Sequence, residues 1–176
     1  EDSTQIPLFG LSEVNMSVFY SFNLSVGGDF PIDLNIQYLE SQLKVMIDSH
    51  FSLKPYMRED MVSVYLSFNH SSDYAYDDFF WNEYQPWFVE RFESNLEVFK
   101  RFGFNDFTLR MNFYVVNSDD AEGDFPQCAF QVLDKDLSTR LFKHGVNAPF
   151  DVFVVNKSKA ADYLKIPLSD PFFDYL

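Results

Sequence analysis

Residues 16–26, MSVFYSFNLSV, decide the fold class because every second residue from Met16 to Val26 is apolar and most of the residues between them are polar. A period of two residues is typical of a strand with one buried face and one wet face. We therefore predict a strand here, ended by a turn at Gly27-Gly28-Asp29. The buried face would carry Met16, Val18, Tyr20, Phe22, Leu24 and Val26, and the wet face Ser17, Ser21, Asn23 and Ser25.

The same alternation returns twice, in residues 61–69 and 107–116. Apolar runs predict two further strands, CAFQVL at 128–133 and FDVFVV at 150–155. The second run is apolar on both faces, so we expect it at the centre of the sheet. Strands with one polar face favour a sheet that helices cover on one side only. The polar face of the sheet would form either an open binding surface or only the solvent-exposed side of the sheet. Its residues are Ser17, Ser21, Ser63, Ser67, Asn112 and Tyr114.

Apolar residues at helical spacing predict helices between these strands. One helix is expected over residues 32–50, and another over 86–102, where Gly103 would end it. Asp134 is placed to cap a short helix over 134–141. The sequence also predicts a break at Pro55, a short aromatic helix within residues 71–84 and a short helix near Ala160.

The resulting order of elements is β-α-β-α-β-β-α-β. It predicts a single α+β domain over residues 1–176, with an irregular C-terminal tail from about residue 164. The expected architecture is a two-layer sandwich. Its sheet is mixed or antiparallel with about five strands, and the helices lie on one face.

The charge of the chain is strongly acidic and uneven. The chain has 27 Asp and Glu and 13 Lys and Arg, which gives a net charge of −14. The whole excess of acidic residues lies in residues 1–124. Binding to nucleic acid needs a basic stripe that displaces counterions, so direct nucleic-acid binding is not expected. A basic protein partner would be attracted over long range. The alternative is that the acidic charge serves solubility alone.

The residue types that usually carry chemistry are few and scattered. His50, His70 and His144 show no metal-ligand spacing, and Cys128 lies on a predicted strand without a basic neighbour. No glycine-rich phosphate loop occurs. We therefore expect no enzymatic activity, no cofactor and no metal. No apolar run reaches the roughly 18 residues of a membrane-spanning helix, so no membrane partner is expected either.

Two acidic segments stand out as candidate partner-binding sites. In the first, carboxylates alternate with aromatic rings, which can anchor a partner while the acids select a basic one. The second is an acidic turn that lacks the order of a calcium loop. The candidate residues are Asp73, Tyr74, Tyr76, Asp77, Asp78 and Trp81, and then Asp119, Asp120, Glu122 and Asp124. The alternative is that the rings face the core and the acids are solvated loops.

Residues 130–154, FQVLDKDLSTRLFKHGVNAPFDVFV, read as a strand, a capped short helix, a glycine and an apolar strand. This segment resembles the closing unit of small acidic α+β immunity-type proteins, which bacteria encode beside polymorphic toxins. The resemblance implies a non-catalytic protein that binds and blocks a basic toxin or nuclease domain. It rests on pattern, and it transfers no functional residue to this chain.

Other functions remain open at this point. The chain could be an acidic DNA mimic that inhibits a DNA-binding protein, or a small-ligand-binding domain with a pocket between sheet and helices. The single Cys128 fits a reducing cytoplasm. A periplasmic or secreted location stays open because the sequence begins at Glu1 and not at methionine. The oligomeric state and the identity of the partner are not encoded in any motif.

Overall fold

A computed structural model describes residues 18–76, 79–117 and 133–174 and shows an α+β fold. The strands are β1 (Val18–Pro31), β2 (Ser52–Met57), β3 (Met61–Phe68), β4 (Asp106–Asn117) and β5 (Phe150–Asn156). The α-helices are α1 (Ile36–Met46), α3 (Gln85–Arg101), α4 (Lys135–Phe142) and α5 (Lys157–Leu164). A π-helical turn, η1 (Phe80–Tyr84), leads into α3, and a 3-10 turn, η2 (Pro171–Phe173), follows α5.

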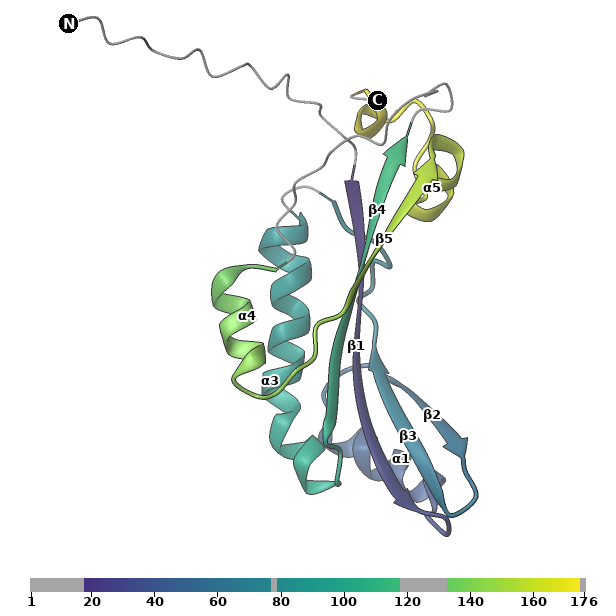
Figure 1. Ribbon diagram of the computed structural model, residues 1–176, viewed down its shortest axis with the longest axis vertical. Coiled ribbons are helices and arrows are strands. Elements are labelled where there is room, and N and C mark those ends of the chain that lie inside the picture. The colour runs from purple at the N-terminus through teal and green to yellow at the C-terminus, as the bar shows by residue number, and fades with distance from the viewer. Residues whose placement is uncertain (1–17, 77–78, 118–132, 175–176) are drawn as a thin grey trace, which may run out of the picture.

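The five strands form one mixed sheet in the order β2-β3-β1-β4-β5 (Figure 1). β1 lies at the centre and pairs antiparallel with β3 on one side and with β4 on the other. β2 pairs antiparallel with β3, whereas β5 runs parallel to β4. The three alternating segments of the sequence thus supply the three middle strands.

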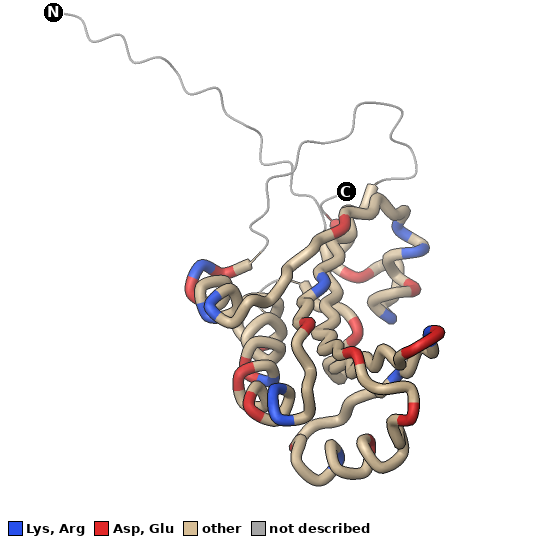
Figure 2. The backbone as a smooth tube through the Cα atoms, turned by 60° about the horizontal axis from the view of Figure 1, so that its bottom comes forward, with Lys and Arg blue, Asp and Glu red and all other residues tan. Residues whose placement is uncertain are grey.

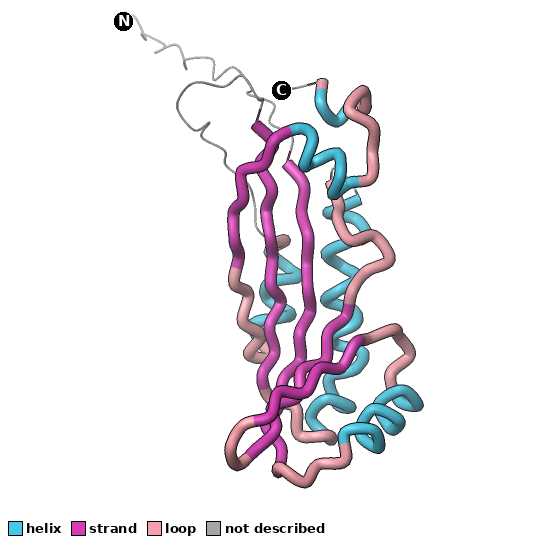
Figure 3. Tube along the Cα trace, turned by 90° about the vertical axis from the view of Figure 1, so that its right-hand side faces the viewer, coloured by secondary structure: helices cyan, strands magenta, loops and turns pink. Residues whose placement is uncertain are grey.

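The main core lies between one face of this sheet and the helices α1, α3 and α4. Alternate residues of β1 and β3, such as Leu24 and Val64, are fully buried there against Phe92 and Phe99 of α3. Figure 3 shows the opposite face of the sheet uncovered along most of its length. At one end of that face, α5 and η2 add a second, smaller cluster around Phe19.

Gly27 and Gly28 do not end β1, so the predicted turn is wrong. The strand continues to Pro31, and both glycines pair with β3 inside the sheet. A Cβ on Gly27 would lie 2.8 Å from the ring of Tyr65, and one on Gly28 would lie 3.0 Å from the carbonyl oxygen of Gly103. The two glycines therefore provide room for a ring and for the turn between α3 and β4, which is a common reason for glycine within a strand.

Residues 32–57 also differ from the sequence prediction. The helix is shorter than expected, because Asn35 caps α1 by accepting a hydrogen bond from the Tyr38 amide at 3.0 Å. Pro55 does not break the chain but lies within β2, opposite Val64. β2 is an edge strand, and an edge strand tolerates proline because its outward amide needs no partner in the sheet.

β5 is an edge strand of the described sheet and not the central strand that its apolar sequence predicts. Phe150, Val152, Phe153 and Val154 are 44–53% exposed. An edge strand can still make apolar contacts: Phe153 of β5 stacks on Tyr114 of β4 with the ring centroids 5.2 Å apart. A continuous apolar run therefore indicates apolar neighbours and does not indicate the position of the strand within the sheet. The strand predicted at 128–133 lies outside the described residues except for Leu133, which is in a bend.

The predicted ends of α3 and α4 and the predicted cap of α4 are confirmed. Gly103 and Gly145 follow α3 and α4 with φ of 88° and 74°, the left-handed conformation that glycine adopts most easily. The side chain of Asp134 accepts hydrogen bonds from the amides of Asp136 and Leu137 and so caps α4. Among the described residues, no helix combines the length and the apolar character needed to cross a membrane.

Candidate partner-binding surface

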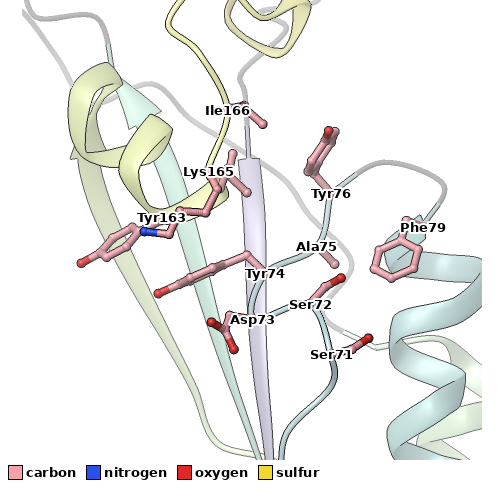
Figure 4. A pocket seen from close by; sticks show the side chains of 11 residues that line it. Ser71, Ser72, Asp73, Tyr74, Ala75, Tyr76, Phe79, Tyr163, Lys165 and Ile166 are labelled. Atoms are coloured by element: carbon pink, nitrogen blue, oxygen red, sulfur yellow. The ribbon is translucent and has the colours of Figure 1, made fainter.

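A pocket of about 600 Å³ lies between the loop that follows β3 and the C-terminal end of α5 (Figure 4). We call it the loop–helix pocket. Its lining is formed by Ser71, Ser72, Asp73, Tyr74, Ala75, Tyr76, Phe79, Tyr163, Leu164, Lys165 and Ile166. The pocket therefore brings the first acidic and aromatic segment of the sequence against a helix that lies about 90 residues further along the chain.

The loop side of the pocket is held by backbone hydrogen bonds to the central strand. The amide of Tyr20 donates to the carbonyl of Ala75, and the amide of Ala75 donates back to the carbonyl of Tyr20, both at 2.9 Å. The hydroxyl of Tyr84 donates to the Asp73 carbonyl at 3.0 Å and accepts from the Phe22 amide at 3.2 Å. The loop is thus anchored to β1 at two adjacent points.

Tyr84 is 1% exposed, and this burial raises the pKa of its phenol well above the ordinary value. The hydrogen bond from Phe22 acts in the opposite direction but is the weaker influence. The hydroxyl therefore keeps its proton, so it can donate to Asp73 at neutral pH. This buried phenol fixes the position of the pocket loop.

The aromatic wall of the pocket also serves as a small core. Tyr74 stacks on Tyr163 with the centroids 5.2 Å apart and meets Tyr114 edge-on at 5.6 Å. Tyr76 packs against Phe172 at 5.1 Å. Burial first, and then the neighbouring phenols, raise the pKa of Tyr74 to about 12, so the phenol is neutral. Tyr74 and Tyr76 are both half-buried, and both also line the pocket. Each ring thus packs against the molecule and also contributes to the pocket wall.

Of the ten candidate partner-binding residues, the structure brings three together in the pocket: Asp73, Tyr74 and Tyr76. Trp81 does not line it. That side chain is 36% exposed on η1 and packs against Phe80 with the centroids 4.9 Å apart. Outside the described residues lie Asp77, Asp78, Asp119, Asp120, Glu122 and Asp124.

Sequence reasoning missed the helix side of the pocket. Tyr163 to Ile166 fall at the start of the segment read as an irregular tail, and no pattern there signals a site. Lys165 ends α5 with φ 58° and ψ 37°, a left-handed conformation that is rare for a residue with a side chain. This turn carries Ile166 to the pocket wall, where its amide donates to the Ala161 carbonyl at 3.2 Å.

His70 is a neighbour of the pocket loop. Its Nδ1 accepts a hydrogen bond from the Ser72 amide at 3.1 Å, and its ring lies edge-on to Trp87 at 4.9 Å and to Tyr84 at 5.2 Å. Burial lowers the pKa of His70 below its ordinary value, and the carboxylate of Glu83 offsets part of that shift. The imidazole therefore favours the neutral form that can accept this hydrogen bond.

Side chains on the open face of the sheet bond to one another. Asn112 donates to the hydroxyl of Ser21 at 3.0 Å, and Ser63, which is buried, donates to the carboxylate of Asp29. Ser17, another residue of the predicted polar face, lies outside the described residues. Within the described ranges, no group of three His, Cys, Asp or Glu side chains is arranged to hold a metal ion.

No protein-family model matches the chain, and no curated protein and no solved structure matches it either.

Proposed function

We propose that this protein is a non-catalytic binding module for a basic protein partner. The observation that carries the proposal is the loop–helix pocket, where Asp73 and the rings of Tyr74 and Tyr76 lie together on a strongly acidic chain. Aromatic side chains in a concave surface supply contact area, and nearby carboxylates select the charge of the partner. The half-exposed rings fit such a role without losing their own packing.

The distribution of charge supports a basic partner. All 13 Lys and Arg lie in the described residues, together with 18 of the 27 acids, so the net charge of that part is −5. The other nine acids include Asp77 and Asp78, which join two residues of the pocket lining, Tyr76 and Phe79. A field of this sign would speed the approach of a cationic protein and make the association rate fall with salt.

A more specific form of the proposal is an immunity-type protein that blocks a basic toxin or nuclease domain. It rests on the resemblance of residues 130–154 to such proteins. The helix and the last strand of that unit correspond to α4 and β5, with Gly145 between them. An inhibitor of this kind needs no catalytic residues, because it acts by covering a surface of its target.

The small-ligand alternative keeps support from the size of the pocket, since about 600 Å³ lies within the usual range for ligand sites. The DNA-mimic alternative needs carboxylates in a continuous ridge. In the described part, acids share their helices with bases, as Figure 2 shows, and Glu93 of α3 is paired with Arg140 of α4. This interspersed charge does not favour mimicry of a phosphate backbone.

The test compares two sets of charge-removing variants. Asp73, Asp77 and Asp78 are changed to Asn in one protein, and Asp119, Asp120, Glu122 and Asp124 are changed to their amides in the matched control. Proteins captured by the wild type are identified by mass spectrometry, and the association rate of the captured protein is then measured at low and high salt. We expect a basic protein whose association slows with salt, and whose binding weakens more in the first variant.

A captured protein whose association rate does not change with salt would contradict the proposed mechanism. Equal weakening by both variants would indicate a general effect of the acidic field, and the pocket would then have no special part in binding. Thermal melting of each variant provides the folding control, because substitutions at exposed loop positions usually change stability by less than about 0.5 kcal/mol each.

A further inference from the structure

The geometry of the loop–helix pocket points to a particular ligand chemistry. We propose that the pocket takes one arginine side chain of the basic partner, with the guanidinium against the ring of Tyr74 and with Asp73 as its counter-charge. This inference rests on the proposed function and deepens it. It follows from two observations, the aromatic wall and the unpaired carboxylate, and the cation of Lys165 on the facing wall provides a further test.

The aromatic wall is pre-formed. Tyr74 is fixed by its stacking on Tyr163 and by the edge of Phe19 at 5.6 Å, and Tyr76 is fixed by Phe172. Rings held in this way lose little conformational freedom when a ligand binds. A flat guanidinium can stack on such faces and gains cation–π attraction there, more than an uncharged group of the same shape would.

Asp73 is available as a counter-charge. Its carboxylate is exposed, and Figure 4 shows it below the ring of Tyr74. All basic side chains of the chain lie in the described residues, and none of them forms an ion pair with Asp73. The backbone of Asp73 is held in place by Tyr84, so the side chain projects from a fixed point of the pocket wall.

Lys165 provides the further test. It lines the wall opposite the loop, and its side chain runs back toward Tyr163 in Figure 4. The pocket lining thus already includes one cation. An incoming guanidinium would meet this charge and would have to displace it or bind against its repulsion. Removing the charge of Lys165 should therefore strengthen the binding of a cation and weaken the binding of an anion.

The experiment uses the full chain and amino-acid derivatives without terminal charges. N-acetyl-arginine amide is titrated into the ¹⁵N-labelled protein, and amide shifts of Ser71–Tyr76 and Tyr163–Ile166 are followed by NMR. N-acetyl-citrulline amide has nearly the same shape without the charge, and N-acetyl-glutamate amide has the opposite charge. We expect the arginine probe to bind in the millimolar range and at least about threefold more tightly than the citrulline probe.

Two variants test the assigned roles. Asp73→Asn should weaken binding of the arginine probe by at least about threefold, and Lys165→Met, which keeps the length of the side chain, should tighten it about twofold. Equal affinity for the arginine and citrulline probes would overturn the proposal. Preferential binding of the glutamate probe, lost in Lys165→Met, would also overturn it. These outcomes leave the proposed function intact, because capture of a basic partner by the wild type is measured separately.

Discussion

Tyr84 joins two distant segments through a single hydroxyl group. It accepts from the Phe22 amide of β1 and donates to the Asp73 carbonyl of the pocket loop, in a nearly fully buried position. A buried hydroxyl with two partners is worth more than a surface hydrogen bond, because its loss leaves buried groups unpaired. The conformation of the pocket thus depends on a residue that does not line it.

We expect Tyr84→Phe to lower the free energy of unfolding by about 1–3 kcal/mol, since the Phe22 amide would lose its partner. Urea denaturation measures this change. Tyr38→Phe is the matched control, because Tyr38 is 63% exposed, and it should alter stability by less than about 0.5 kcal/mol. If Tyr84→Phe changed the free energy of unfolding as little as Tyr38→Phe does, water would have to replace the lost hydroxyl.

His70 makes the pocket loop sensitive to pH. Its pKa is lowered in the folded protein, so below about pH 6.5 the unfolded chain binds a proton more readily than the folded one. Stability should therefore fall as the pH decreases from about 6.5 through the lowered pKa, and level off below it. Protonation of Nδ1 would also remove the acceptor for the Ser72 amide, while Glu83 partly favours the charged ring.

His70→Asn tests this origin of the pH dependence, because the Asn side chain can accept a hydrogen bond but does not titrate. Urea midpoints of the wild type and the variant are compared between about pH 7.5 and about pH 5. We expect the wild type to lose more stability than the variant over this range. Parallel profiles for the two proteins would assign the pH dependence to other groups.

At the scale of elements, β1 shows what alternation can and cannot predict. The alternating positions of residues 21–26 correctly separate the buried and solvent-facing sides, but Phe19, at a solvent-facing position of the pattern, is fully buried in the second cluster. The end of the strand is not predictable from them, because a glycine pair usually signals a turn. Here the pair instead admits the ring of Tyr65 and the carbonyl of Gly103, and these contacts come from segments more than 35 residues away in the sequence.

Gly28→Ala should destabilise the protein by about 1–3 kcal/mol. The new Cβ would lie 3.0 Å from the carbonyl oxygen of Gly103 and 3.2 Å from the Cα of Phe104, and backbone atoms cannot rotate away as a side chain can. The higher strand preference of alanine offsets only part of this cost. Thermal melting gives the measurement. Ser67→Ala, on the open face of β3, is the control, and a neutral Gly28→Ala would mean that the turn after α3 shifts freely.

The other errors at this scale have related causes. Pro55 was read as a break because proline lacks an amide donor, yet an edge strand does not need that donor. β5 was placed at the centre because its residues are apolar on both faces. Sequence alone does not reveal which strands lie at the edges, since this depends on the order in which strands pair. The Asp134 cap and the glycines that follow α3 and α4 are local signals, and they were predictable for that reason.

At the scale of the whole molecule, the sequence located half of the candidate site. Asp73, Tyr74 and Tyr76 were recognisable because acids and aromatic rings alternate within a few residues. Tyr163 and Lys165 carry no such signal, and they reach the pocket only because α5 packs across the end of the open face. A surface formed by segments far apart in sequence cannot be assembled before the topology is known.

The net charge of −14 leads to a prediction for the entire chain. Mutual repulsion of excess acids destabilises the compact state, and salt screens this repulsion over distances of about 10 Å. We expect moderate sodium chloride to raise the melting temperature, with a smaller gain in a protein whose Asp119, Asp120, Glu122 and Asp124 are changed to amides. A melting temperature that falls with salt would show that the ion pairs, such as that of Glu93 with Arg140, dominate the electrostatics instead.

The central position of β1 has a consequence for synthesis on the ribosome. β1 leaves the ribosome first among the described strands, but its longest partner, β4, ends only at Asn117. At about 5–20 residues per second, the interval between the two amounts to about 4–17 s. During this time, β3, α1 and α3 are the main elements that can pack against β1. The nascent chain therefore exposes a long, unpaired strand edge in the period when chaperones bind, and its strong negative charge would keep neighbouring nascent chains apart.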